Sequence, residues 1–180
     1  MSTRVKVNFV GGSMVVSEGV GEDSIAVMQR YIADVGKRAR DLTPVFNQWV
    51  PVLFQQEEEI FDAEGIPAWP ALSPAYADWK SRHFGDLPIL ERSGRLKESL
   101  TQNTSDTIMR VGPRSMSFGT RVPYSAYLQE GSFKGSMGPR PHLYMVEDNF
   151  EEMSVMALDY IAQGGGTRRF GTGAILRSIQ

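Results

Sequence analysis

The residues that could support chemistry in this chain are few and far apart. The sequence contains no cysteine and only two histidines, His83 and His142, with no carboxylate motif beside either. Without cysteine there can be no disulfide, thiolate nucleophile or Cys-based zinc or iron–sulfur site. No G-x-S-x-G nucleophile elbow is present, although a Ser/His/Asp triad assembled by the fold stays open. The pattern does not predict an enzyme.

Two glycine-rich segments invite comparison with phosphate-binding loops. Gly19–Ser24 reads GVGEDS, lies between an expected strand and an expected helix, and superficially matches a dinucleotide fingerprint. Its two acidic residues, Glu22 and Asp23, would face the pyrophosphate at the helix N-terminus, where bare amides are required. Gly164–Arg169 has no lysine after its last glycine and no following helix. We expect no cofactor, and a small nucleotide-binding enzyme using the Gly19–Ser24 turn is the alternative function.

A run of acidic residues, Glu57-Glu58-Glu59 followed by Asp62, is a conceivable metal site built from carboxylates alone. The same residues fit the solvated acidic end of a helix. We interpret them in that way and expect no metal.

The middle of the chain is locally basic and aromatic. Trp79 and Phe84 are interleaved with cationic residues, namely Arg82, Arg92, Arg95, Lys97, Arg110 and Arg114. Such a mixture can follow single-stranded nucleic acid, and it is also enriched at protein interfaces. The net charge of −2, from 19 basic and 21 acidic residues, provides no global attraction for nucleic acid or an anionic membrane. We therefore favour a protein interface.

No run of the sequence approaches the roughly 20 apolar residues that a membrane helix needs, and the first residues lack the apolar core of a signal peptide. No membrane partner is expected.

Periodicity indicates the elements that must position these residues. Alternating apolar residues over 5–16, interrupted by Gly11-Gly12, predict a hairpin with one face on a core. Apolar residues at spacings of three and four predict a helix from an N-cap at Ser24 to Leu42. A second helix is expected from a Thr43 cap to Phe61, kinked or split by Pro51.

The remaining elements are expected to be short. The sequence predicts helices over 74–84 (capped by Ser73), 94–100 (capped by Ser93), 123–130 and 147–163, and strands over 106–111, 116–122 and 142–146. The fold class is therefore α+β: long N-terminal helices packed on a small antiparallel sheet, with an extended aromatic and basic arm and a C-terminal helix. Residues 1–163 would form one domain with the arm inserted at about 65–100, and 164–180 a flexible basic tail.

Two groups of residues carry a resemblance to a known family. The first is Trp69-x-x-Leu72-Ser73-Pro74-x-Tyr76, then Lys80, then Ile89-Leu90-x-Arg92-Ser93-Gly94-x-Leu96-x-x-Ser99. The second is Pro123-Tyr124, Gln129, Gly131 and Pro139-Arg140-Pro141-x-Leu143. Together they resemble the virion-morphogenesis, or tail-completion (head–tail joining), family of tailed bacteriophages, over residues 26–163.

The resemblance implies a non-enzymatic structural protein of the virion, assembled in the bacterial host cytoplasm. It would form a homo-oligomeric ring, six- or twelve-fold, that completes the tail or joins it to the head. Its partners would be the other neck, connector and tail-tube proteins of the phage, with possible contact to packaged DNA. A heterologous interface whose rotation closes produces such a ring.

Within this hypothesis the arm contacts a neighbouring subunit. We expect four apolar anchors buried in that contact, Trp69, Leu72, Tyr76 and Trp79. The alternative for Trp69 and Trp79 is that they anchor the arm on the chain's own core. Charged contacts at the rim, or to the acidic helix end near Glu57, would come from Arg92, Arg95 and Arg140. Contacts to a neighbour or to DNA are expected from Arg168, Arg169 and Arg177, and a DNA-contacting channel protein is a further alternative.

Overall fold

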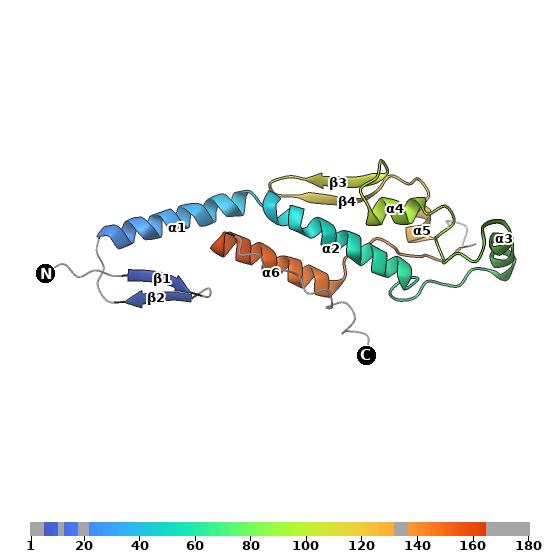
Figure 1. Cartoon of the computed structure of the whole chain (residues 1–180), viewed down its shortest axis with the longest axis horizontal. Coiled ribbons are helices and arrows are strands. Elements are labelled where there is room, and N and C mark those ends of the chain that lie inside the picture. Colours follow the sequence, from blue (N-terminus) through green and yellow to red (C-terminus); the bar gives the residue numbers. More distant parts are fainter. Residues whose placement is uncertain (1–5, 11–12, 18–21, 132–136, 165–180) are drawn as a thin grey trace.

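The computed structural model describes residues 6–10, 13–17, 22–131 and 137–164, with side chains from Ser24 onward. Over these ranges the molecule is elongated, with α1 near one end and α3 at the other (Figure 1). The elements in chain order are β1 (Lys6–Val10), β2 (Ser13–Ser17), α1 (Glu22–Arg40), α2 (Thr43–Asp62), α3 (Pro74–Phe84), α4 (Arg95–Thr101), β3 (Thr107–Val111), β4 (Met116–Thr120), α5 (Ser125–Glu130) and α6 (Glu147–Gln163). The α+β class predicted from the sequence is confirmed.

The N-terminal strands form the expected antiparallel hairpin. β1 pairs with β2 from Lys6 opposite Ser17 to Val10 opposite Ser13. The expectation that one face of this hairpin packs on a core concerns side chains outside the described part of the chain.

The two long helices follow each other almost end to end (Figure 1). α1 begins at Glu22, so Ser24 lies inside its first turn and the predicted cap is wrong. α2 is one continuous helix that contains Pro51, so the predicted split does not occur. Pro51 is exposed, and the carbonyl four residues earlier that it leaves without a helical donor is therefore on the wet side of the helix. The helix begins at Thr43 itself, whose amide donates to the Asp41 carboxylate at 3.0 Å.

The core lies where the second half of α2 meets α4 and the end of β4. Ile60 and Phe61 of α2 are fully buried against Leu96 and Leu100 of α4. Leu96 and Leu100 are four residues apart, which places both side chains on one face of α4. The core thus joins the second half of α2 to α4 of the arm.

The sheet is smaller than expected. β3 and β4 form an antiparallel hairpin, with Thr107 opposite Thr120 and Val111 opposite Met116, and the described residues add no third strand to it. The strand predicted over 142–146 is wrong.

Residues 142 and 143 are held by a side chain instead of a neighbouring strand. The Gln129 Oε1 atom accepts from the amides of His142 (2.9 Å) and Leu143 (3.1 Å). Its Nε2 group donates to the Leu143 carbonyl at 3.0 Å. The backbone groups that a strand partner would have satisfied are therefore paired with α5.

The arm contains both predicted helices. α3 spans Pro74–Phe84, follows Ser73 and ends before Gly85, as expected. α4 starts at Arg95, and its N-cap is Gly94 with φ of 74°, not Ser93. This left-handed backbone is a conformation that glycine adopts without steric cost, so the preceding serine cannot take the capping position.

Candidate functional site

Trp69 is a residue of the chain's own core. Its side chain is 5% exposed and packs edge-on against Phe61, with ring centroids 5.6 Å apart. The indole Nε1 group donates to the Pro141 carbonyl at 2.6 Å. The expectation that Trp69 anchors a contact between subunits is therefore corrected, because it has no free surface to offer a neighbour.

The expectation that Arg140 makes a charged contact at the rim of an interface is also corrected, because Arg140 forms hydrogen bonds inside the subunit. Its side chain is buried, and its guanidinium donates to the Pro70 carbonyl from Nε (3.1 Å) and Nη2 (2.9 Å). Nη2 also donates to the Ala71 carbonyl at 3.2 Å. Arg140 thus fixes the start of the arm to the 139–141 segment.

Tyr76 and Trp79 lie on the surface, where a partner can reach them. Their rings stack with centroids 5.5 Å apart, and the Trp79 ring also stacks on His83 at 4.9 Å. Phe84 packs edge-on against Trp79, and the Arg92 guanidinium lies 5.7 Å from the centre of the Phe84 ring. We call these five residues the α3 aromatic cluster. It contains three of the predicted interface residues, Tyr76, Trp79 and Arg92, and all three are exposed.

The other predicted arm residues differ in their environments. Leu72 is half-buried and lines a cavity of about 630 Å³ between the arm and α5, together with Tyr76 and Arg92. Arg95 is exposed and forms a two-bond ion pair with Asp106, at 2.6 and 2.9 Å, which lowers the pKa of that carboxyl. It therefore joins α4 to the turn before β3 and does not contact the acidic end of α2.

Lys80, which belongs to the same arm pattern, is buried and closes the loop after α3. Its ammonium group donates to the carbonyls of Leu87 (2.7 Å) and Pro88 (2.5 Å). Burial lowers the pKa of Lys80, and the carboxylates of Glu64 and Glu91 oppose that shift. Lys80 therefore stabilises the loop after α3, a structural role that the sequence pattern did not indicate.

The acidic run in α2 is not a uniformly solvated helix end, and this interpretation is corrected for Glu57. Glu58 and Asp62 are exposed, but Glu57 is fully buried and neither of its carboxyl oxygens has a hydrogen-bond partner among the described residues. Burial raises the pKa of Glu57 to about 8. The neighbouring Gln56 amide opposes this shift only in part, because its own hydrogen bonds go to the 144–149 segment.

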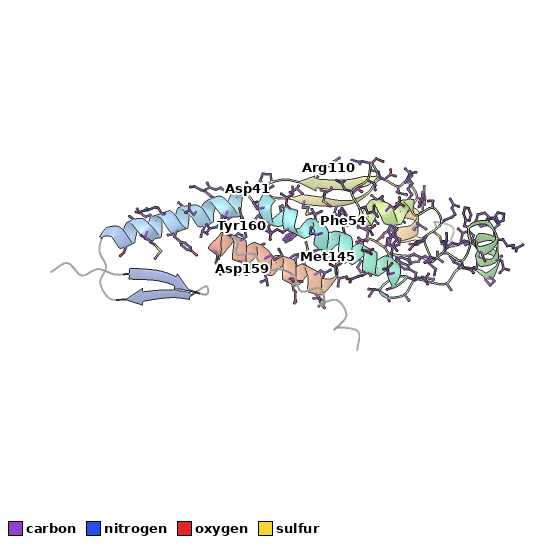
Figure 2. All side chains as sticks on the ribbon, in the orientation of Figure 1. Asp41, Phe54, Arg110, Met145, Asp159 and Tyr160 are labelled. Atoms are coloured by element: carbon purple, nitrogen blue, oxygen red, sulfur yellow. The ribbon has the colours of Figure 1, made fainter. Side chains whose placement is uncertain are left out.

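A cavity of about 280 Å³ lies beside Glu57, and we call it the Glu57 cavity. One face of α2 contributes four of its residues, Trp49, Leu53, Gln56 and Glu57. The rest are Met116, Phe118, Leu143, Tyr144, Met145 and Met153. Met145 lies between α2 and α6 (Figure 2). The Trp49 Nε1 group is also buried without an acceptor among the described residues, so two of the residues that line this largely apolar cavity hold an unpaired donor and two unpaired acceptors. Sequence reasoning missed this site.

Ser125 and His142 form a close pair that is not a catalytic triad. The Ser125 hydroxyl lies 2.9 Å from His142 Nε2, and His142 Nδ1 lies 3.1 Å from the Arg140 carbonyl. A carbonyl can only accept, so Nδ1 carries the hydrogen and Nε2 accepts from the serine. The imidazole is fully buried, and burial lowers its pKa. The third position is held by a backbone carbonyl where a triad needs a carboxylate.

Two helices present apolar side chains to solvent. The first half of α1, which extends beyond α6, exposes four of them, Ile25, Val27, Met28 and Ile32. α6 exposes three, Phe150, Val155 and Leu158. The two helices are tied together by Arg38, which donates to the Ile161 carbonyl (2.8 Å) and the Ala162 carbonyl (3.1 Å). We call these seven apolar residues the α1/α6 surface.

Arg168, Arg169 and Arg177 lie outside the described residues, as do Gly19 to Gly21 of the glycine-rich turn. Within the described ranges, no three His, Asp or Glu side chains are grouped so that they could bind a metal ion. None of the helices described is both long and apolar enough to cross a membrane.

Comparison of the chain with protein-family models, with curated proteins and with solved structures found no match. The family suggested by the arm and the 123–143 segment therefore remains a hypothesis that stands on those residues.

Proposed function

We propose that this chain is a non-enzymatic structural subunit of the neck or tail end of a tailed bacteriophage, where it forms a homo-oligomeric ring. The observation that carries the proposal is the exposure of large apolar side chains on helices at both ends of the elongated subunit. Exposed apolar side chains that gather on particular elements are typical of protein contacts. The resemblance of the arm and the 123–143 segment to the tail-completion family supplies the kind of assembly.

The arrangement of these surfaces suits a ring. A closed ring needs two different patches on each subunit, which meet head to tail. The α1/α6 surface lies toward one end of the molecule and the α3 aromatic cluster lies at the other (Figure 1). One subunit's cluster would pack on the next subunit's α1/α6 surface, so each copy uses both of its patches.

The α3 aromatic cluster has the composition of an interface centre. Tyr76 and Trp79 bring large rigid rings, and Arg92 brings a guanidinium, which are the groups that dominate binding energy at protein interfaces. Trp69 and Arg140 act indirectly, because they hold the arm against the core. The contact to other neck, connector and tail-tube proteins would use the parts of the ring that its own subunits leave free.

The first test is the mass of the purified chain in solution, alone and after mixing with phage particles that lack a finished neck. We expect a closed oligomer, or a monomer that becomes a stoichiometric component of the particle. A monomer that ignores the particles would refute the proposal.

A double variant locates the contact. Tyr76→Ala/Trp79→Ala removes exposed rings, so the chain should fold and bind at least about tenfold more weakly, a loss of about 1.4 kcal/mol or more. The matched control is Tyr127→Ala, which removes an exposed ring of α5 outside both surfaces. Equal incorporation of the double variant and the control would show that α3 is not the contact.

A further inference from the structure

The buried carboxyl group of Glu57 lacks a hydrogen-bond or ion-pair partner among the described residues. Both carboxyl oxygens and the Trp49 indole nitrogen lack hydrogen-bond partners among the described residues, and all three atoms belong to residues that line the Glu57 cavity. An ion pair to Glu57 is also absent from the described part of the chain. Buried polar groups are normally paired, and an uncompensated carboxylate costs several kcal/mol.

The size and lining of the cavity indicate what can fill it. Its volume of about 280 Å³ is just below the range of about 300–1,000 Å³ typical of small-molecule sites. Its walls are largely apolar, with Met116, Met145 and Met153 able to adjust their shape to an occupant. A side chain with a hydrocarbon stem and a polar head suits such walls better than a cofactor does.

Among such side chains, arginine matches the free polar atoms. A guanidinium presents parallel N–H groups to a carboxylate and pairs with both oxygens at once, and neither oxygen of Glu57 has a hydrogen-bond partner among the residues that the structure describes. It also stacks on aromatic rings, and Trp49, Phe118 and Tyr144 line the cavity.

We propose that segment 165–180 of the same chain docks in the Glu57 cavity and that Arg168 or Arg169 forms an ion pair with Glu57. The segment contains three arginines and no acidic residue, and Phe170 follows the arginine pair. The arginines bring the positive charge that Glu57 lacks as a partner, and Phe170 brings an apolar side chain that suits the largely apolar walls. The inference does not depend on the proposed ring.

The segment also begins within reach. Met153 of α6 lines the cavity, and the helix ends at Gln163, so its rise carries the chain about 16 Å from Met153 to Gly164. An extended chain advances about 3.3 Å per residue, so about five residues are enough to return. Arg169 is the fifth residue after Gly164.

The test is the titration of the Glu57 side-chain carboxyl by NMR in the full chain. An arginine partner lowers a carboxyl pKa by about 1–3 units, so the pKa of Glu57 should be at least about one unit lower in the wild type than in Arg168→Ala/Arg169→Ala. The control Arg30→Ala/Arg82→Ala removes the same charge from two exposed positions and should titrate like the wild type. Equal Glu57 pKa values in the wild type and the tail variant, or an equal shift in the control, would overturn the proposal.

A second measurement, with a spin label, tests directly whether segment 165–180 lies near the Glu57 cavity. Because the chain has no cysteine, Thr172→Cys accepts a single spin label. The label should broaden the Trp49 indole N–H resonance of its own chain, and Glu57→Gln should weaken this effect. Absence of broadening would overturn the docking. Broadening seen only when labelled chains are mixed with unlabelled isotope-enriched chains would assign the cavity to a neighbour's segment and overturn same-chain docking.

Discussion

Replacing Trp69 separates the fold of the arm from its role in assembly. Trp69→Ala would empty a core position that is 5% exposed and would remove the indole contact with Phe61. Deleting a buried tryptophan costs about 3–5 kcal/mol, and losing its hydrogen bond to the Pro141 carbonyl adds about 1 kcal/mol. The free energy of unfolding should fall by about 4–6 kcal/mol, against a total of about 5–15 kcal/mol for a typical domain.

Trp69→Phe divides that loss into packing and hydrogen bonding. Phenylalanine keeps an aromatic ring beside Phe61 but cannot donate, so the Pro141 carbonyl is left without its donor. The cost should be about 1–3 kcal/mol for an unsatisfied buried group. This variant also gives a measurable answer if Trp69→Ala does not fold at all.

The assay is urea unfolding of the isolated chain, followed by circular dichroism because one of the three tryptophans is changed. Trp79→Ala is the matched control, since Trp79 belongs to the same arm but is 37% exposed. Its free energy of unfolding should change by no more than about 1 kcal/mol. Equal costs for Trp69→Ala and Trp79→Ala would refute the assignment of Trp69 to the chain's own core.

Three further predictions follow from buried polar side chains. Arg140→Ala should destabilise the chain by about 3 kcal/mol or more, because it removes a buried cation with several hydrogen bonds, and limited proteolysis should then cut within 65–100. Lys80→Met should cost about 1–3 kcal/mol and speed hydrogen exchange over 85–90, because two carbonyls lose their donor. Burial lowers the folded-state pKa of His142, so as pH falls below the unfolded value of about 6.5 the unfolded state binds more protons. The unfolding free energy of the wild type should therefore fall below pH 6.5 relative to His142→Asn, and parallel pH profiles would contradict this.

The sequence predicted correctly those elements whose ends are set by residues at the boundary itself, such as proline and glycine. α3 starts after Ser73-Pro74 and stops at Gly85, and both boundaries follow from the backbone preferences of those residues. The β3–β4 hairpin was equally predictable, because alternating residues flank a turn that contains glycine and proline. Such elements need no information about distant parts of the chain.

The candidate interface was only partly predictable, because core anchors and interface anchors have the same composition. Trp69 and Trp79 are chemically identical, and their environments are decided by partners far away in the sequence. Trp69 meets Pro141, whereas Trp79 meets residues of its own helix and its end. Spacing along the chain does not supply such long-range pairings, so it could not divide the two tryptophans between core and surface.

The Glu57 cavity was missed because an acidic run is normally solvated. Whether an acidic residue of this run is buried depends on the face of α2 on which it lies, and the helical spacing indicates that face. Glu57 follows Trp49 by two turns and Leu53 by one, and Ile60 continues the same apolar face. Reading the acidic residues by face, rather than as a run, would have separated Glu57 from its exposed neighbours.

The path of residues 142 and 143 has a consequence for sequence change. The three hydrogen bonds that fix it involve one side chain, Gln129, and their other ends are main-chain groups that every residue type except proline possesses. Leu143 can therefore be exchanged for another apolar residue of its size while the backbone keeps its course. Position 129 has no such freedom, since even glutamate would lose the donor to the Leu143 carbonyl. In a library of variants, intolerance should gather on α5, away from the segment whose shape it preserves.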